Sequence, residues 1–129
     1  MTSVAADALR ARIERASESW REGGAHDRAE TDRTVAELLD ALERGEVRAA
    51  ERGADGHWRA IHWVKAGIML AFRVGELVEM GRVEGSAFRF FDRHPFSIRD
   101  FTLEDGVRIV PGGSIIRRGA HVAAGVICL

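Results

Sequence analysis

The sequence predicts an α+β fold, in which an N-terminal helical domain with a small β-hairpin leads into the first coil of a hexapeptide-repeat β-helix. Three observations support it. Apolar residues recur at helical spacing near the N-terminus, a tight-turn dipeptide separates two short segments, and residues 110–128 repeat every six positions. We therefore divide the chain into a domain over residues 1–105 and the start of the β-helix over residues 106–129.

Two amphipathic helices are predicted at the N-terminus, over residues 4–21 and 29–44. Their apolar residues recur every three or four positions, which places them on one face of each helix. Gly23-Gly24 ends the first helix and Gly45 the second, because glycine is favoured just past a helix. The short loop between them predicts a helical hairpin.

A β-hairpin and a buried helix are predicted next. Asp55-Gly56 is a strong turn signal between the segments 47–51 and 57–61. Residues 62–74 are apolar nearly all round, which is typical of a buried helix. Gly67 in its interior costs about 1 kcal/mol relative to alanine, so we expect another element to approach closely there. The predicted core includes Leu38, Leu42, Trp58, Trp63, Leu70 and Phe72.

The rest of the first domain is predicted to be short elements. Residues 76–85 are rich in turn formers, and residues 88–92 predict a short aromatic strand that His94-Pro95 ends.

A last strand leads into the repeat. Ser97 or Asp100 is expected to cap one helical turn near residues 98–104, and residues 107–110 predict the strand. No linker rich in Ser, Pro or Gly separates the two parts, so we expect the helical domain and the coil to pack together.

The C-terminal repeat has the pattern of a β-helix. In each hexad an aliphatic side chain points inward, and a glycine permits a positive φ at a corner. Three hexads make about one coil, which cannot bury its inner face without neighbours. We therefore expect this chain to be the front of a longer protein, with residues 109–129 its least stable part and a driver of association. The inward register comprises Val110, Ile116, Val122 and Cys128, and the glycine register comprises Gly113, Gly119 and Gly125.

Composition excludes several classes of function. A formal net charge of −1 over 129 residues gives no overall attraction to nucleic acid or to acidic membranes. The lone cysteine rules out an intrachain disulfide and indicates a reducing compartment, and the N-terminus lacks a secretion signal. No apolar stretch is long enough to span a bilayer. We therefore expect a cytoplasmic protein.

The histidines and the cysteine have structural interpretations that we favour. His57, His62, His94 and His121 show no metal-ligand spacing, so we predict no metal site. His121 at the end of its hexad is a candidate general base, but a corner histidine is the simpler interpretation. Cys128 is predicted to be a small core residue rather than a nucleophile. We assign no catalytic residue.

Aromatic, basic and glycine candidates are treated in the same way. Trp58 and Trp63 could stack on a ring, but core packing is favoured because both border an apolar helix. Arg117 and Arg118 are expected to point outward into solvent. Gly112-Gly113 is not a phosphate loop, because no Gly-Lys-Ser/Thr follows it.

Four stretches carry a resemblance to a known family. Residues 58–73 contain two tryptophans five positions apart, and residues 90–92 read Phe-Phe-Asp. Residues 106–111 read Gly-Val-Arg-Ile-Val-Pro, and residues 116–123 read Ile-Arg-Arg-Gly-Ala-His-Val-Ala. These stretches resemble the N-terminal domain of tetrahydrodipicolinate N-succinyltransferase and the start of its left-handed β-helix. The resemblance covers nearly the whole chain.

The resemblance implies an activity and a substrate-binding residue. Members of the family transfer succinyl from succinyl-CoA to the amine of ring-opened tetrahydrodipicolinate in the diaminopimelate and lysine pathway. They are homotrimers with the acyl-CoA site between adjacent β-helices, so we expect this chain to bind no cofactor by itself. The motif arginine that contacts the substrate falls on Arg108. A planar guanidinium suits that role, since it binds a carboxylate through two parallel hydrogen bonds.

The sequence departs from the family at its C-terminus. Members continue past the position of Ile127 with coils that carry the acidic residue at the substrate amine and the CoA groove, whereas this sequence stops at Leu129. We therefore expect a fragment that is inactive alone. The alternative is a non-catalytic interaction module that binds a full-length paralogue or another partner that supplies further coils. A third interpretation is an unrelated α+β domain with coincidental hexads.

Overall fold

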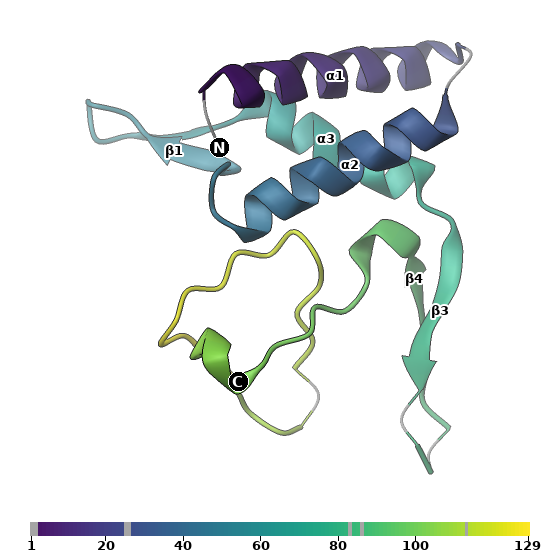
Figure 1. Cartoon of the computed structure of the whole chain (residues 1–129), viewed down its shortest axis with the longest axis vertical. Helices are drawn as coiled ribbons and strands as arrows, with labels where there is room; N and C mark the ends of the chain where they lie inside the picture. Colours follow the sequence, from purple (N-terminus) through teal and green to yellow (C-terminus); the bar gives the residue numbers. More distant parts are fainter. Residues whose placement is uncertain (1–2, 25–26, 83, 86, 113) are drawn as a thin grey trace.

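Three helices form the upper layer of the molecule, and two smaller arms extend below it (Figure 1). The computed structural model describes residues 3–24, 27–82, 84–85, 87–112 and 114–129. The helices are α1 (Ser3–Glu22), α2 (Arg28–Glu43) and α3 (His62–Val74). One arm is the ribbon of β3 (Leu77–Arg82) and β4 (Arg89–Arg93), and the other is the C-terminal segment with β5 (Arg108–Ile109) and β6 (Ile127–Cys128).

The predicted helical hairpin of α1 and α2 is confirmed, with bounds within one residue of those predicted. Asp27 caps α2, because its carboxylate accepts a hydrogen bond from the Glu30 backbone N–H at 2.9 Å. Gly45 has a φ of +70°, as expected for a glycine that follows a helix.

Helix α3 has the predicted bounds, and Gly67 lies where another element approaches. A Cβ placed on Gly67 would lie 3.1 Å from Ile13 Cγ2 and closer still to Leu38 Cδ2. Glycine at this position therefore lets α3 pack tightly against both α1 and α2.

One hydrophobic core joins the three helices. Leu38, Leu42 and Leu70 are buried in it as predicted, and Trp63 packs against it while partly exposed. Two predicted members were wrong: Trp58 is 71% exposed and Phe72 is 37% exposed. Trp58 lies on a hairpin that projects from the helices, so no other element covers its side chain. The buried core comprises Leu9, Ile13, Val35, Leu38, Leu39, Ala41, Leu42, Val47, Val64, Leu70, Ala71, Val74 and Phe96.

The predicted β-hairpin is confirmed as antiparallel β1 (Ala50–Arg52) and β2 (Trp58–Ala60). Gly56 has a φ of +81° at the turn, and the Gly53 N–H donates to the His57 carbonyl at 2.9 Å. All six strand residues are exposed. The hairpin therefore adds little to the core.

The prediction of turns over residues 76–85 was wrong, because β3 occupies Leu77–Arg82. This strand pairs antiparallel with β4, in the region predicted as an aromatic strand. The register shifts between Glu79 and Gly81, where Gly81 has a φ of +139°. A glycine inside a strand is typical of a bulge. In the sequence, Gly81 counts among the turn formers, which is why the strand was not predicted.

Two short 3₁₀ helices connect the ribbon to the C-terminal segment. His94–Phe96 follows β4, where His94-Pro95 was expected to end the strand. Leu103–Asp105 is capped by Thr102 rather than by Ser97 or Asp100. The Thr102 N–H donates to the Asp105 carboxylate at 2.7 Å, and such a reciprocal capping box outcompetes a lone serine or aspartate.

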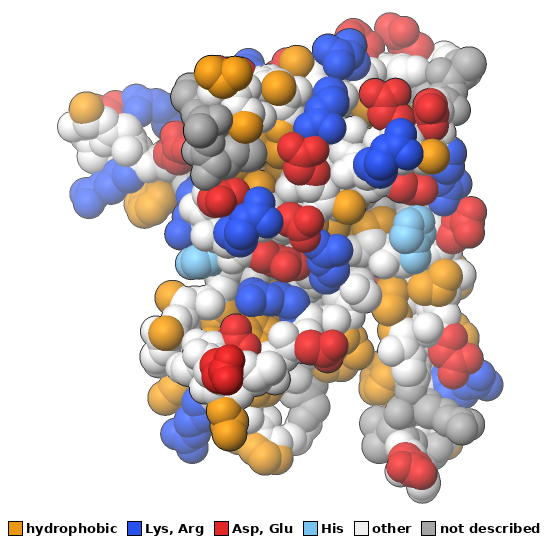
Figure 2. Space-filling view, in the orientation of Figure 1, with side chains coloured by type: hydrophobic (Ala, Val, Ile, Leu, Met, Phe, Trp, Pro, Cys, Tyr) orange, Lys and Arg blue, Asp and Glu red, His pale blue; other side chains and the backbone are white. Residues whose placement is uncertain are grey.

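The helical layer and the C-terminal segment pack together, as predicted, where Arg118 Nε and the Gly119 N–H both donate to Glu43 Oε1 of α2. The C-terminal segment also pairs with the stretch that follows the first 3₁₀ helix. Residues 97–99 run beside residues 116–118, with the Arg99 N–H donating to the Ile116 carbonyl at 2.8 Å and the Arg118 N–H to the Ser97 carbonyl at 2.9 Å. Figure 2 shows charged side chains spread over the helical layer and hydrophobic ones gathered around the C-terminal segment.

Candidate functional site

Arg108 lies on β5, which pairs in parallel with β6 near the C-terminus. The Arg108 N–H donates to the Val126 carbonyl, and the Val110 N–H donates to the Cys128 carbonyl, both at 3.0 Å. Ile109 lies opposite Cys128, so the pairing is offset by one residue from the hexad register that contains Val110 and Cys128. The chain between the paired strands is thus one residue longer than three exact hexads.

The Arg108 side chain is exposed, and its guanidinium makes no hydrogen bond or ion pair with any described residue. A guanidinium in this setting offers its full fork of donors to a ligand. Carboxylate and phosphate match that fork best, because each accepts two parallel N–H groups.

A hydrogen-bonded turn before β5 holds the strand in place. Gly106 has a φ of +62°, and its carbonyl accepts a hydrogen bond from the Gly125 N–H at 2.8 Å. Just before it, hydrogen bonds from the Thr102 backbone N–H and hydroxyl lower the pKa of Asp105 below its usual value. Arg108 therefore follows a capped, hydrogen-bonded turn rather than a free loop.

An apolar cavity of about 540 Å³ lies between the helical layer and the C-terminal segment. Among the residues that line it are Leu39, Leu42, Ile68 and Phe72 from the helices and Ile116 and Val122 from the hexads. Val110, Ile116, Val122 and Cys128 are each partly buried, whereas Ile109, Ile115 and Ile127 are exposed. The predicted inward register thus has the lower exposure.

The expectation that Arg117 and Arg118 are free in solvent was wrong. Arg118 pairs with Asp40 and with Glu43 of α2, and Arg117 pairs with Asp92 of β4. The pKa of Asp92 is lowered first by the Arg93 backbone N–H and then by Arg117, against an opposing effect of desolvation. Their acidic partners are distant in sequence, so the hexad pattern could not predict these pairs.

The four histidines considered in the sequence analysis make structural contacts or lie exposed. His121 Nδ1 lies 2.8 Å from the Glu43 carbonyl oxygen, which makes it a donor to the end of α2. His94 Nδ1 accepts a hydrogen bond from the Glu76 N–H at 3.0 Å, and its Nε2 lies 3.9 Å from Asp32 Oδ1. This His94–Asp32 pair escaped the sequence reasoning, because the two residues come from different elements and carry no motif. His57 and His62 are exposed.

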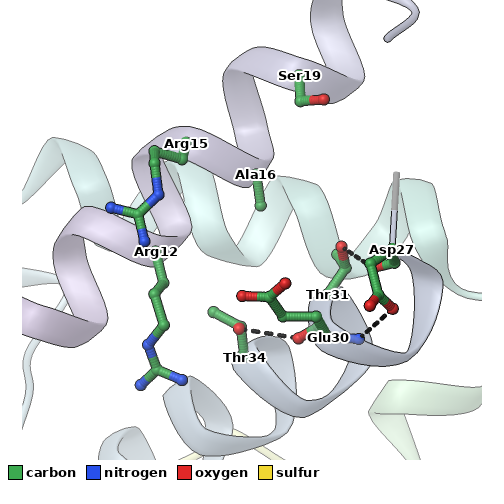
Figure 3. Close-up of a pocket in the computed structure, with 8 residues that line it drawn as sticks. All are labelled: Arg12, Arg15, Ala16, Ser19, Asp27, Glu30, Thr31 and Thr34. Atoms are coloured by element: carbon green, nitrogen blue, oxygen red, sulfur yellow. Dashed lines mark hydrogen bonds between the residues drawn. The ribbon is translucent and has the colours of Figure 1, made fainter. Parts of the chain in front are cut away.

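A smaller pocket of about 170 Å³ between α1 and α2 has a structural role (Figure 3). The Thr31 hydroxyl donates to the carbonyl of the cap residue Asp27, and the Thr34 hydroxyl donates to the Glu30 carbonyl, each at 2.9 Å. Arg12 of α1 pairs with Glu37 of α2. The Arg12, Asp27, Thr31 and Thr34 side chains therefore already have partners in or next to the two helices, and the polar groups of the pocket do not converge on a common point.

Within the described ranges, no three His, Cys, Asp or Glu side chains group to hold a metal ion, and no helix has the length and apolar character to cross a bilayer. Cys128 is free and partly buried. Gly112 has a φ of +133°, and Gly113 lies outside the described residues.

Comparison with known proteins agrees with the resemblance in the sequence. A family model described as tetrahydrodipicolinate N-succinyltransferase N-terminal matches residues 8–74. Curated relatives named 2,3,4,5-tetrahydropyridine-2,6-dicarboxylate N-succinyltransferase include those of Histophilus somni strain 2336 (31% identical, 78% of this chain, 37% of the relative) and Mesorhizobium japonicum (38%, 78% and 36%). A third is from Leptothrix cholodnii (39%, 74% and 35%). This chain spans little more than a third of the length of these relatives.

Proposed function

This chain belongs to the tetrahydrodipicolinate N-succinyltransferase N-terminal family, and we propose that it supplies the dicarboxylate-binding N-terminal part of such an enzyme. The proposed reaction transfers succinyl from succinyl-CoA to the amine of ring-opened tetrahydrodipicolinate, in the diaminopimelate and lysine pathway. The amine attacks the thioester carbonyl, and the thiol of CoA leaves. This chain's part is to bind and orient the acceptor.

The exposed guanidinium of Arg108 carries the proposal. It lies on a paired strand, next to a capped turn, and it has no partner among the described residues. An arginine held in place by its backbone but free at its side chain is suited to a ligand with carboxylates. We propose that Arg108 binds one carboxylate of the acceptor through two parallel hydrogen bonds.

We further propose that residues 106–129 form the first coil of a left-handed β-helix. The parallel pairing of β5 with β6 supports this, because the two strands are separated by about one coil of sequence. Positive φ values recur at Gly106, Gly112, Gly119 and Gly125, close to a six-residue spacing. Handedness is proposed from the family resemblance, as is assembly into a trimer.

A titration with a stable cyclic dicarboxylate, pyridine-2,6-dicarboxylate, tests the role of Arg108. We expect saturable binding by calorimetry, which Arg108→Ala abolishes and Arg108→Lys weakens about tenfold or more, since lysine cannot form the bidentate pair. Arg33→Ala is the matched control, because Arg33 is also an exposed arginine and lies on helix α2, away from β5. Equal binding by wild type and Arg108→Ala would refute the proposed role.

Turnover is expected to need residues beyond these 129. The resemblance places the acyl-CoA groove between neighbouring coils, and a single coil offers no such groove. We therefore expect no release of free thiol above background when the 129-residue chain is mixed with succinyl-CoA and the cyclic dicarboxylate. Turnover that Arg108→Ala abolishes would contradict this expectation.

A second candidate function, an interaction module, is favoured by one observation. Among the described residues, β6 has a strand partner on one side only, and the neighbouring Ile127 and Leu129 are 53% and 93% exposed. An unpaired edge beside exposed aliphatic side chains can pair with another strand. Binding of a chain of family coils that survives Arg108→Ala, with no dicarboxylate binding, would favour this function.

A further inference from the structure

The last turn of α2 carries charges that are unfavourable for an isolated helix. Asp40 and Glu43 lie there, and the turn contains no basic residue. The carbonyl end of a helix carries a partial negative charge, so carboxylates near it are destabilising. The nearby Arg44 pairs with Glu46 at 2.9 Å instead. The favourable partners of this turn must therefore come from elsewhere in the fold.

The C-terminal segment supplies those partners. Glu43 Oε1 accepts hydrogen bonds from the Gly119 N–H at 2.8 Å and from Arg118 Nε at 3.1 Å. Arg118 also pairs with Asp40, and His121 Nδ1 lies against the Glu43 carbonyl oxygen. The Glu43 side chain is only 18% exposed, so solvent screens these bonds less than it screens a surface ion pair.

At two glycines of this contact, neighbouring side chains leave no room for a Cβ. A Cβ on Gly119 would lie 2.8 Å from Leu39 Cδ2, and Gly119 has a φ of +86°. On the helix side, a Cβ on Gly45 would lie 2.9 Å from the His121 ring. Both glycines are therefore needed for residues 118–121 to rest on the end of α2.

The contact between residues 118–121 and the end of α2 holds the middle of the chain that joins β5 to β6, and Arg108 lies on β5. Residues 118–121 lie about midway in sequence between β5 and β6, which pair with each other. Fixing the middle of the loop on α2 restricts the tilt of the β5–β6 pair relative to the helices. The backbone bonds to Ser97 and Arg99 hold the same loop at a second point.

We propose that the acidic C-terminal turn of α2 anchors the C-terminal segment, and that Glu43 is a positioning residue for Arg108. The anchor recognises an Arg-Gly turn by charge and by the close approach of the Gly119 backbone to the Glu43 and Leu39 side chains. This inference rests on the proposed function, because it assumes that Arg108 binds the dicarboxylate.

Two matched variants of α2 test the anchor. Glu43→Ala removes it, whereas Glu37→Gln changes a carboxylate of the same helix that pairs with Arg12 of α1. We expect Glu43→Ala to weaken binding of pyridine-2,6-dicarboxylate by about three- to tenfold; tenfold is the limit in which the whole free energy of the lost hydrogen bond goes into holding Arg108 in its binding position. Glu37→Gln should leave the affinity within about twofold. Glu43→Gln should recover part of the loss, because the amide oxygen still accepts from the Gly119 N–H.

Amide exchange provides a readout that is independent of the ligand. In wild type, the Gly119 amide should exchange faster as salt is raised, because salt screens the Arg118 pairs. In Glu43→Ala it should exchange faster at all salt concentrations, with unchanged helical circular dichroism. Should Glu43→Ala fail to fold, Arg118→Met tests the same joint from the other side.

The outcomes separate this inference from the proposed function. If Arg108→Ala leaves dicarboxylate binding intact, the proposed function fails. If Arg108→Ala abolishes binding while Glu43→Ala and Arg118→Met leave it unchanged, the anchor is overturned and the proposed function stands. Slow Gly119 exchange in Glu43→Ala would equally overturn the anchor.

Discussion

Gly67 offers a test in which two physical effects predict opposite signs. It lies inside α3, where alanine is the better helix former by about 1 kcal/mol. If helix propensity alone decided the result, Gly67→Ala would stabilise the protein. The Cβ that alanine adds, however, would lie 3.1 Å from Ile13 Cγ2 and closer still to Leu38 Cδ2.

We expect the steric cost of the added Cβ to exceed the gain in helix propensity. Leu38 and Ile13 are both fully buried, so neither can move aside without displacing other core residues. Overpacking of this kind costs about 1–3 kcal/mol. After subtracting the gain in propensity, we expect Gly67→Ala to lower the free energy of unfolding by up to about 2 kcal/mol. The change corresponds to a fall in Tm of several degrees.

Urea denaturation followed by tryptophan fluorescence measures the effect. Ala8→Gly is the matched control, because Ala8 is an exposed residue of α1 and should lose about 1 kcal/mol from propensity alone. Combining Gly67→Ala with Leu38→Val, which makes room, should cost less than the sum of the single changes. A Gly67→Ala protein more stable than wild type would refute the packing argument.

Three further outcomes follow from the burial, the hydrogen bonds and the strand edges. Trp63→Ala, at the partly buried margin of the core, should cost about 2–3 kcal/mol in denaturation experiments, whereas Trp58→Ala on the exposed hairpin should cost less than about 1 kcal/mol; equal losses would contradict the core assignment. The pKa of Asp105 is lowered by Thr102, so its carboxylate stabilises the fold above the ordinary aspartate pKa and loses that effect as pH falls through the lowered value; Asp105→Asn should therefore flatten the stability curve below about pH 4, and an unchanged acid limb would count against it. Residues 109–129 should promote concentration-dependent association in sedimentation, or exchange their amides fastest in a monomer; a monomer with strong protection there would disprove the stacking argument.

The helical half of the fold was largely predictable from the sequence, because its signals are local. Apolar residues at helical spacing and the flanking glycines gave the bounds of α1, α2 and α3 to within one residue. Asp55-Gly56 indicated the hairpin for the same reason. Even the close approach at Gly67 could be inferred, since a glycine is unfavourable inside a helix unless packing needs it.

The pairing of β3 with β4 and the exposure of Trp58 were not predictable from local sequence patterns. Strand β3 is stabilised by pairing with β4 and by a bulge at Gly81, whereas its sequence suggests turns. Trp58 borders an apolar helix in the sequence but lies on a projecting hairpin. In both cases the deciding partner is another element, or the lack of one, and local pattern does not encode it.

The candidate site divides along the same line. The motif around Arg108 and the membership of the family were available from the sequence alone, because both depend on residue identity at fixed spacing. The sequence also specified the hexads, since their glycine and aliphatic positions reflect the conformational preference and burial of single residues. Only the tertiary structure decided that Arg118 meets Asp40 and Glu43 and that Arg108 keeps its guanidinium free. Charges distant in the chain find partners through the packing of whole elements, and that packing depends on the fold rather than on any local pattern.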